Sequence, residues 1–399
     1  MNGVFENIDR ICQINTERVL EAFRENKVSE AMLHGTTGYG YDDRGREILD
    51  KVFAHSFGAE DALVRHTFVS GTHTIATALF GVLRPGDTIL SVTGKPYDTL
   101  CETFGLTGDD GNGSLKDFGI QYKDIELDVN GHPQIELMKR MIRDDPSIKL
   151  VFIQRSRGYT TRKTVSLEDI EQIAAEAKSV RDLIVFTDNC YGEFVREKEP
   201  TAAGVDLMAG SLIKNPGGGI ARTGGYICGR KDLVELCAYR LTAVGIGKEC
   251  GATLDELRNM FQGFFTAPHT VAQALKTAVY AAEKLTEAGY TVSPSADEER
   301  EDIIQTVTFG NAEDLLAFCR GIQHGSPVDS FVTPEPWAMP GYDCDVVMAA
   351  GGFISGASIE ISADAPLKPP YTAYLQGGLT FESGKYAVNT ALKYISESK

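Results

Sequence analysis

The chain lacks long hydrophobic runs and a basic leader segment. None of its 399 residues belongs to an apolar stretch long enough to cross a membrane. The opening residues, MNGVFENIDRICQ, contain acids where a secretory signal would carry basic residues followed by an unbroken apolar stretch. We therefore expect a cytoplasmic protein.

Positive charge is also in short supply. The chain has 39 Lys and Arg residues against 56 Asp and Glu residues, which gives a net charge of −17. A surface of this sign repels phosphate backbones and anionic head groups, so we expect neither nucleic acid nor membrane as a partner. The hydrophobic content of 42% is ordinary for a globular protein, and the length allows a large domain plus a smaller one.

Metal and nucleotide motifs are missing as well. The eight cysteines are scattered, with no C-x-x-C pair and no Cys/His cluster at zinc spacing. We therefore expect no metal, and thiols in a reducing compartment. The segment GGGIARTGG departs from the dinucleotide pattern G-x-G-x-x-G because Arg222 takes the place of its last glycine.

Strand and helix patterns alternate through the first part of the chain. We expect a helix over 167–178 and strands over 62–69, 88–92, 149–154, 183–187 and 225–229. This alternation predicts an α/β fold with a mainly parallel sheet covered by helices on both faces. In such a fold, ligands bind on the loops at the carboxyl ends of the strands.

The predicted organisation has four parts. They are N-terminal helices and an arm at 1–45, a large domain at 46–252, a connecting helix at 253–290 and a smaller α+β domain at 291–399. Within the last part we expect a helix over 313–320, a closing helix over 381–395, and strands over 303–309 and 346–361.

Two residues on the predicted loops suggest covalent cofactor chemistry. Asp188 ends a buried-type strand, and Lys214 enters a loop rich in Pro and Gly. A lysine amine reacts with an aldehyde only when unprotonated, and no acid flanks Lys214 in sequence, so we expect burial to depress its pKa. A carboxylate such as Asp188 can keep a pyridinium nitrogen protonated. A surface lysine and a turn-forming aspartate are the alternatives for each residue alone.

Two further segments suit a phosphate. The turn SGTHT, Ser70 to Thr74, opens an apolar helix and offers free N–H groups at its positive end, although Ser and Thr caps are routine. The loop containing Tyr39, Tyr41 and Arg44 carries phenol and guanidinium donors. A packed tyrosine turn with a surface arginine explains that loop equally well.

On these residues, the chain resembles the Cys/Met-metabolism branch of fold-type-I pyridoxal 5'-phosphate (PLP) enzymes. Within that branch it is similar to the aluminium-resistance protein group of methionine gamma-lyase-like carbon–sulfur lyases. The resemblance covers the chain from about Gly35 to the C-terminus. It implies the PLP-transferase fold, PLP as cofactor, and β- or γ-elimination on a sulfur-containing amino acid such as cystathionine, methionine or cysteine.

The resemblance also implies individual roles. Lys214 in SLIKNPGGG would hold PLP as a Schiff base, Asp188 in FTDNCY would face the ring nitrogen, and Tyr97 in KPYDTL would stack on the ring. The phosphate would be held by Ser70, Gly71, Thr72 and Ser211. Tyr41 and Arg44 would reach into a neighbouring subunit, which implies a homo-oligomer, a dimer or tetramer.

The chain departs from the family pattern at two places. Ile213 stands where the lyases have a second phosphate-binding hydroxyl. Where they carry an arginine for the substrate carboxylate, the C-terminal strand here offers only Lys368, which cannot form a bidentate clamp. Other candidates are Arg157, with Arg155 and Arg162 beside it in QRSRGYTTRK, unless these are solvated loop residues.

Two other functions stay open on the sequence. A PLP-dependent aminotransferase or aldolase would use the same lysine and aspartate and would differ only in its substrate contacts. A non-catalytic nucleotide-binding or regulatory protein would use the glycine-rich segments without PLP.

Overall fold

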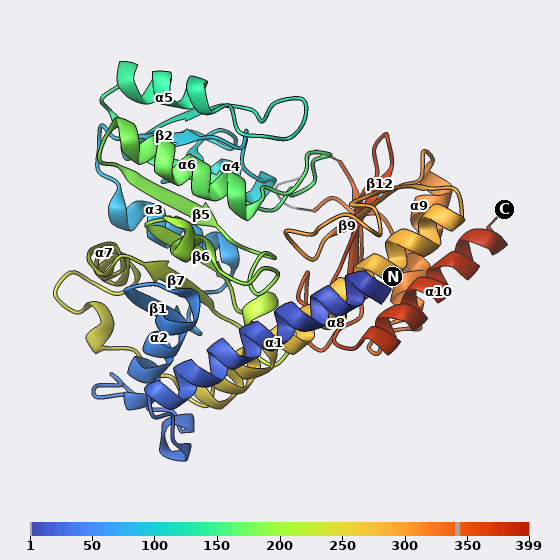
Figure 1. Cartoon of the computed structure of the whole chain (residues 1–399), viewed down its shortest axis with the longest axis horizontal. Helices are drawn as coiled ribbons and strands as arrows, with labels where there is room; N and C mark the ends of the chain where they lie inside the picture. The colour runs from blue at the N-terminus through green and yellow to red at the C-terminus, as the bar shows by residue number, and fades with distance from the viewer. Residues whose placement is uncertain (1, 340–343, 399) are drawn as a thin grey trace.

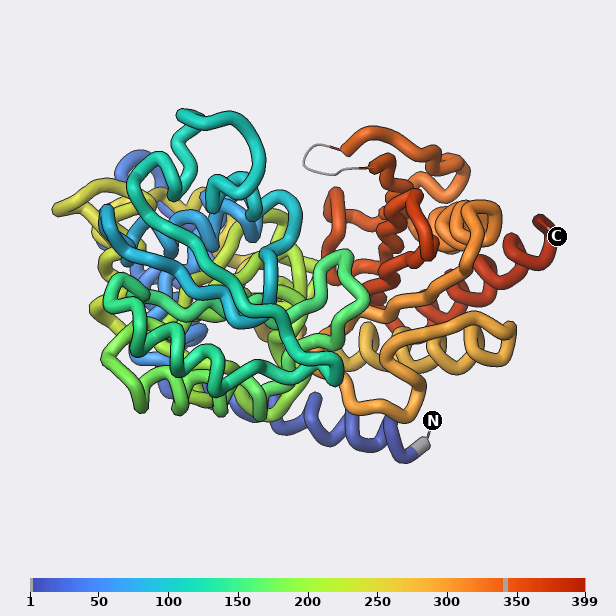
Figure 2. Tube along the Cα trace, turned by 90° about the horizontal axis from the view of Figure 1, so that it is seen from above, coloured from blue at the N-terminus to red at the C-terminus, as the bar shows by residue number. Residues whose placement is uncertain are grey.

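The structure is a computed structural model that describes residues 2–339 and 344–398. It contains two sheets, and the helices α1 (Asn2–Glu25) and α8 (Leu257–Glu287) run side by side from the first sheet towards the second (Figure 1). The tube in Figure 2 shows the same arrangement from above. No helix in the described chain combines the length and the apolarity that a bilayer crossing requires.

The first sheet has seven strands in the order β1-β7-β6-β5-β4-β2-β3. Its strands are β1 (Asp61–Arg65), β2 (Thr88–Ser91), β3 (Gln121–Asp124), β4 (Ile148–Gln154), β5 (Ile184–Asp188), β6 (Leu207–Ser211) and β7 (Gly225–Gly229). The strands from β3 to β6 pair in parallel, whereas β7 is antiparallel to both of its neighbours. The predicted α/β fold with a mainly parallel seven-stranded sheet is therefore confirmed. The exposed edge strand β3, which is polar, was not predicted.

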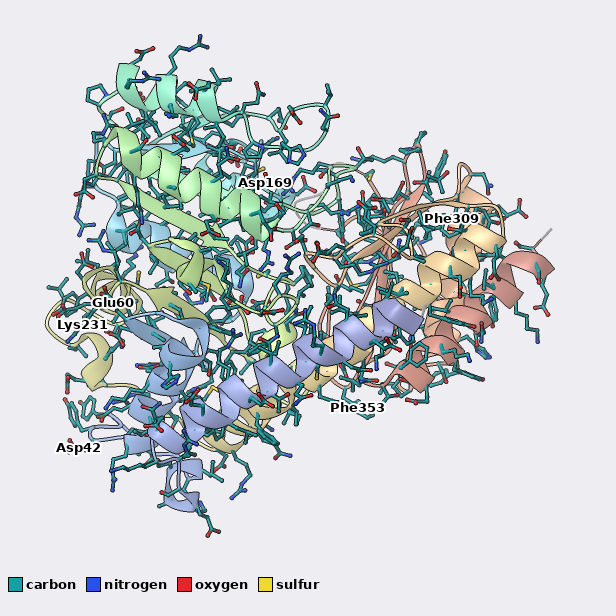
Figure 3. All side chains as sticks on the ribbon, in the orientation of Figure 1. Asp42, Glu60, Asp169, Lys231, Phe309 and Phe353 are labelled. Carbon is teal, nitrogen blue, oxygen red and sulfur yellow. The ribbon has the colours of Figure 1, made fainter. Side chains whose placement is uncertain are left out.

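Helices cover both faces of this sheet, because strand side chains alternate between the two faces. One face packs against α2 (Arg44–Phe57), α5 (Ile135–Asp144), α6 (Leu167–Val180) and α8. The other packs against α3 (Gly71–Val82), α4 (Asp98–Phe104) and α7 (Lys231–Leu241). Glu60, just before β1, accepts a hydrogen bond from the backbone N–H of Lys231 at 3.0 Å and so ties the start of α7 to the sheet edge (Figure 3).

The second sheet is antiparallel and has the order β10-β11-β12-β9-β8. Two helices, α9 (Ala312–His324) and α10 (Phe381–Glu397), pack on it. Its strands are β8 (Thr291–Ser293), β9 (Gln305–Thr308), β10 (Val346–Ala350), β11 (Ser362–Pro366) and β12 (Thr372–Gln376). α8 lies within the predicted connector, and the predicted domain boundaries stay predictions.

The expectation of strands over 346–361 is confirmed for β10 and is wrong beyond Ala350. The segment after β10 leaves the sheet and contacts the lysine loop, where the N–H of Ile359 donates to the carbonyl of Ile213 at 3.0 Å. The next strand, β11, reads SADAP, a sequence with little β propensity. It forms because Ala363 and Ala365 pack into the core beneath α9 and α10.

The loop after Lys214 is held by close backbone packing against α8. An added Cβ at Gly263 of α8 would lie 2.3 Å from the carbonyl oxygen of Gly217, a distance that atoms do not tolerate. The hydroxyl of Thr270, two turns further along α8, donates to the carbonyl of Gly218 at 3.2 Å. The position of the lysine loop therefore depends on a glycine in a helix far along the chain.

We expect Gly263→Ala to lower the free energy of unfolding by about 1–3 kcal/mol, because α8 must move away from the loop. Urea unfolding measures the change. The matched control is Gly3→Ala in α1, where an added Cβ meets nothing within 4 Å; it should leave stability unchanged or raise it by up to about 1 kcal/mol. Equal effects of the two substitutions would contradict the close packing.

Candidate functional site

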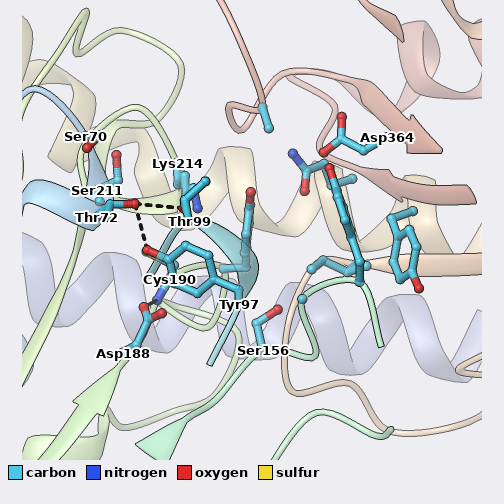
Figure 4. Close-up of a pocket in the computed structure, with 18 of the residues that line it drawn as sticks. Ser70, Thr72, Tyr97, Thr99, Ser156, Asp188, Cys190, Ser211, Lys214 and Asp364 are labelled. Atoms are coloured by element: carbon cyan, nitrogen blue, oxygen red, sulfur yellow. Dashed lines mark hydrogen bonds between the residues drawn. The ribbon is translucent and has the colours of Figure 1, made fainter. Parts of the chain in front are cut away.

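A cavity of about 290 Å³ lies between the carboxyl ends of the first-sheet strands and the second sheet (Figure 4). The first-sheet side is lined by Ser70, Gly71, Thr72, Tyr97, Asp188, Cys190, Tyr191, Ser211 and Lys214, among others. The second-sheet side is lined by Met348, Asp364, Tyr374 and Gln376. Seven of the residues predicted to form a site therefore meet at one cavity, as strand ends of a parallel sheet do.

Lys214 follows β6 and reaches into the cavity, where its Nζ lies 3.8 Å from the centre of the Tyr191 ring. Tyr191 itself has a φ of 73°, a left-handed conformation that is uncommon outside glycine and is found at functional sites. The strained backbone places the phenol ring beneath the lysine amine.

The expectation that the pKa of Lys214 is depressed is wrong for this structure. Burial acts to lower the pKa, but Cys190, Tyr191 and Asp188 outweigh burial and hold the pKa of Lys214 well above its ordinary value. These residues belong to the β5 loop and are remote from the SLIKNPGGG segment in sequence. The fold supplies the acidic neighbour that the local sequence lacks.

Asp188 is the last residue of β5 and is buried. Its Oδ1 accepts a hydrogen bond from the N–H of Cys190 at 3.1 Å. Burial raises the pKa of the Asp188 carboxyl, and the charge of Lys214 acts in the opposite direction. The arrangement places a desolvated acid close enough to a lysine for each to change the proton affinity of the other.

Tyr97 is held at both its backbone and its hydroxyl. Its N–H donates to Oε1 of Gln154 at 2.8 Å, and its hydroxyl lies 2.9 Å from Oγ1 of Thr72 (Figure 4). Burial raises the pKa of Tyr97 above its ordinary value, so the phenol is neutral. Sequence reasoning predicted Tyr97 and Thr72 for different tasks and missed both their hydrogen bond and Gln154.

The turn at Ser70 begins α3 at the cavity wall. Ser70 is the N-cap of α3, and its Oγ accepts a hydrogen bond from the N–H of His73 at 3.1 Å. The N–H groups of Gly71 and Thr72 belong to the first turn, which has no intrahelical acceptors. A Cβ at Gly71 would lie 3.4 Å from Sγ of Cys190 and 3.5 Å from Cβ of Ser211, so glycine leaves room at the cavity wall.

The three arginines considered for the substrate carboxylate do not line the described cavity. Arg157 is buried and donates to Oγ of Ser293 at 3.1 Å, away from Lys214. Arg155 donates to Oδ1 of Asn189 at 2.8 Å. Arg162 donates to the carbonyl of Ser156 at 2.6 Å, and burial lowers its pKa to about 10. In this structure they brace the loop after β4.

The other predicted residues lie at the surface. Lys368 is exposed in the turn between β11 and β12 and does not line the cavity. Tyr41 is 62% exposed, and its ring centre lies 5.5 Å from that of Tyr39. Arg44, the first residue of α2, is also exposed. A role for these side chains at a cavity therefore requires a second subunit, and it stays a prediction.

Sequence reasoning missed the second-sheet wall of the cavity. Asp364 on β11 pairs with Tyr374 on β12, and Gln376 lies two residues further along β12 on the same face. Tyr159, from the loop after β4, packs against this wall with its ring tilted by 37° and its ring centre 5.0 Å from that of Tyr374. The alternation within SADAP and TAYLQ is a signal for these strands, but each segment has only five residues.

Comparison with known proteins gives consistent matches over the whole chain. The sequence model of methionine gamma-lyase matches residues 1–396. A carbon-sulfur lyase involved in aluminum resistance from Clostridium novyi is 52% identical, covers 98% of this chain and 92% of its own, and superposes with a TM-score of 0.94. The uncharacterized protein YnbB of Bacillus subtilis is 50% identical over 398 residues, which are 100% of this chain and 94% of YnbB.

A more distant structure defines the fold. CalE6, a methionine gamma lyase from Micromonospora echinospora, is 19% identical, covers 87% of this chain and 86% of its own, and superposes with a TM-score of 0.58. The resemblance to this group of enzymes and the fold-type-I architecture are therefore confirmed.

A buried carboxyl beneath the cavity makes stability depend on pH. Burial raises the pKa of Glu193 to about 8, although the hydrogen bond from Tyr226 to its Oε1 at 2.7 Å opposes the rise. The unfolded chain loses this proton near pH 4.5, whereas the folded protein keeps it until about pH 8. The stability that Glu193 contributes is thus present below pH 4.5 and is lost as the pH rises to about 8.

We expect Glu193→Gln to remove this loss, because glutamine has no proton to release. Relative to the wild type, the free energy of unfolding of the variant should rise by up to about 1.4 kcal/mol for each pH unit between pH 4.5 and about pH 8. Urea unfolding across this pH range measures the difference. Glu335→Gln, at an exposed carboxyl, is the control for lost charge. Parallel profiles for wild type and E193Q would show that Glu193 is ionised in the folded protein.

Proposed function

Because the chain belongs to the methionine gamma-lyase family, we propose that it is a PLP-dependent carbon–sulfur lyase. It acts on a small sulfur-containing amino acid and breaks the bond between carbon and sulfur at the β or γ position. The observation that carries the proposal is the meeting of Lys214, Asp188 and Tyr97 in one cavity with the N-terminus of α3. The name of the Clostridium novyi relative, a carbon-sulfur lyase, supports the reaction class.

The residues present fit PLP. The first-turn N–H groups of Gly71 and Thr72, with the hydroxyl of Ser211, would hold the phosphate. Lys214 would hold the aldehyde carbon, and the buried carboxylate of Asp188 would hold a positive charge at the ring nitrogen. The position of Ile213 next to Lys214 means that a second hydroxyl is absent from the immediate neighbour of the lysine.

When bound, PLP supplies an electron sink that stabilises negative charge at the substrate Cα. Lys214 would be the base that takes the proton from Cα, acting through its neutral amine, because it is the one basic side chain among the described residues that line the cavity. Tyr97, held in place by Gln154 and Thr72, orients the ring and shields it from water. Asp188 would keep the ring nitrogen protonated, which sustains the electron withdrawal that elimination of the thiol requires.

Purified protein should be yellow, and Lys214→Ala should lose this absorption and lower the rate of elimination by at least about 10²-fold. The assay measures keto acid and thiol released from L-cystathionine, L-methionine and L-cysteine. The matched control is Lys163→Ala, at an exposed lysine paired with Glu298 at 2.7 Å, which should stay yellow and active. Amine transfer to a keto acid without thiol release would overturn the lyase assignment. A colourless protein that takes up no PLP would overturn the assignment of PLP as the cofactor.

We also propose that the active unit is a homo-oligomer in which the loop of Tyr41 and Arg44 completes a neighbouring site. The support is the exposure of Tyr39 and Tyr41 on a loop with no described contact to the cavity of its own subunit. Paired exposed aromatics beside an arginine are typical of interfaces, and the arginine can bind a phosphate oxygen.

Arg44→Ala should therefore lower activity by at least about tenfold, because it removes a charge-assisted hydrogen bond. Co-expression of R44A and K214A chains that carry different tags gives a hybrid oligomer. Its activity shows whether the loop of Tyr41 and Arg44 completes the site of its own subunit or that of the neighbouring subunit. If Arg44 acts across the interface, the hybrid contains one complete site and regains activity, although each parent is impaired. A hybrid no more active than R44A alone would place the loop at its own subunit's site.

A further inference from the structure

The second-sheet wall of the cavity carries an acid that the proposed chemistry does not use. Asp364 of β11 lines the cavity and is 5% exposed. Figure 4 shows it across the pocket from Thr72, Tyr97 and Lys214, on the side away from the α3 turn. A ligand held at Lys214 would therefore meet Asp364 with the part of its side chain that lies beyond the reacting carbon.

Asp364 is only partly satisfied by its neighbours. A hydrogen bond from Tyr159 stabilises its ionised form. Its Oδ1, however, is buried and has no hydrogen-bond partner among the described residues. The Nε2 of Gln376, on the same wall, is also buried without a partner in the described chain. Buried polar atoms are nearly always paired, so these two mark a place where a ligand supplies the partners.

The charges that line the cavity indicate which kind of ligand group would pair with Asp364. Burial raises the pKa of Asp364 to about 6, so the carboxyl is ionised at neutral pH. Among the described residues that line the cavity, Lys214 is the one basic side chain, and it is committed to the cofactor. A buried carboxylate without a cation is strongly unfavourable, and a hydrogen-bonded ammonium group offsets much of that cost.

We propose that Asp364 is a specificity-determining residue that selects amino acids with an ammonium group on the side chain beyond the sulfur. The inference rests on the proposed function for its carbon–sulfur chemistry, and it names the class of substrate. L-cystathionine carries such a group on its departing thiol, whereas L-methionine does not. Gln376, beside Asp364, would donate to an oxygen of the same distal group.

Binding to the PLP-loaded protein tests the inference apart from elimination. The probes are L-lysine and L-2-aminoheptanoate, which differ in a terminal ammonium or methyl group and contain no sulfur to eliminate. Calorimetry should give at least about tenfold tighter binding of L-lysine, or about 1.4 kcal/mol. Asp364→Asn should bring the two affinities within about twofold. Asp314→Asn, at another buried acid, is the matched control and should keep the preference, because Asp314 bonds Tyr290 away from the cavity.

Turnover supplies a second measurement that needs no variant. S-(2-aminoethyl)-L-cysteine and S-propyl-L-cysteine differ in the same terminal group, and we expect kcat/KM to favour the first by at least about tenfold. Equal or undetectable binding of both probes, or an unchanged preference in D364N, would overturn the inference. Tighter binding of L-lysine without thiol release from either cysteine derivative would instead overturn the proposed elimination and leave the role of Asp364 intact.

Discussion

The site depends on opposite charges that the fold brings together in a desolvated cavity. Asp188 ends β5, Lys214 follows β6, and these neighbouring parallel strands deliver both side chains to the same edge of the sheet. Burial alone would favour the neutral form of both groups, because water no longer solvates the carboxylate or the ammonium group. Their mutual attraction opposes this effect of burial, so the protonation of each group depends on the other. The rest of the molecule holds these two loops at a fixed separation.

Several layers of structure maintain that separation. On one side, Asn215 donates to the carbonyls of Tyr191 and Glu193 at 3.0 and 2.9 Å, which joins the loop after Lys214 directly to the loop after Asp188. On the other side, Gly263 of α8 packs closely against the backbone of Gly217. The arginines after β4 belong to the same scaffold: their guanidinium groups bond backbone and side-chain oxygens within the protein. These hydrogen bonds hold the loop after β4 in place beside the cavity.

The sequence was sufficient for the parts of the protein that repeat a strong local pattern. Alternating strands and helices predict a parallel sheet, and a parallel sheet gathers its strand ends, which is why Asp188, Lys214, Tyr97 and the Ser70 turn meet. It was insufficient where tertiary contacts override local preference. β11 has the composition of a loop, and the segment before it bonds the lysine loop through Ile359. The pKa of Lys214 was misjudged for the same reason, because its acidic neighbour lies 26 positions away, at 188 against 214.

The long helix α8 has a consequence for how this protein can change over evolution. Its first half packs on the lysine loop, and the helix also contacts β8, β9 and β12 of the second sheet. One continuous helix therefore contacts both the wall that would hold the cofactor and the sheet that forms the opposite wall. Substitutions on the second wall would change what the cavity accepts while leaving Lys214 in place on the first wall. Changes to a few side chains on β11 and β12 would therefore be enough to change the range of substrates in related proteins.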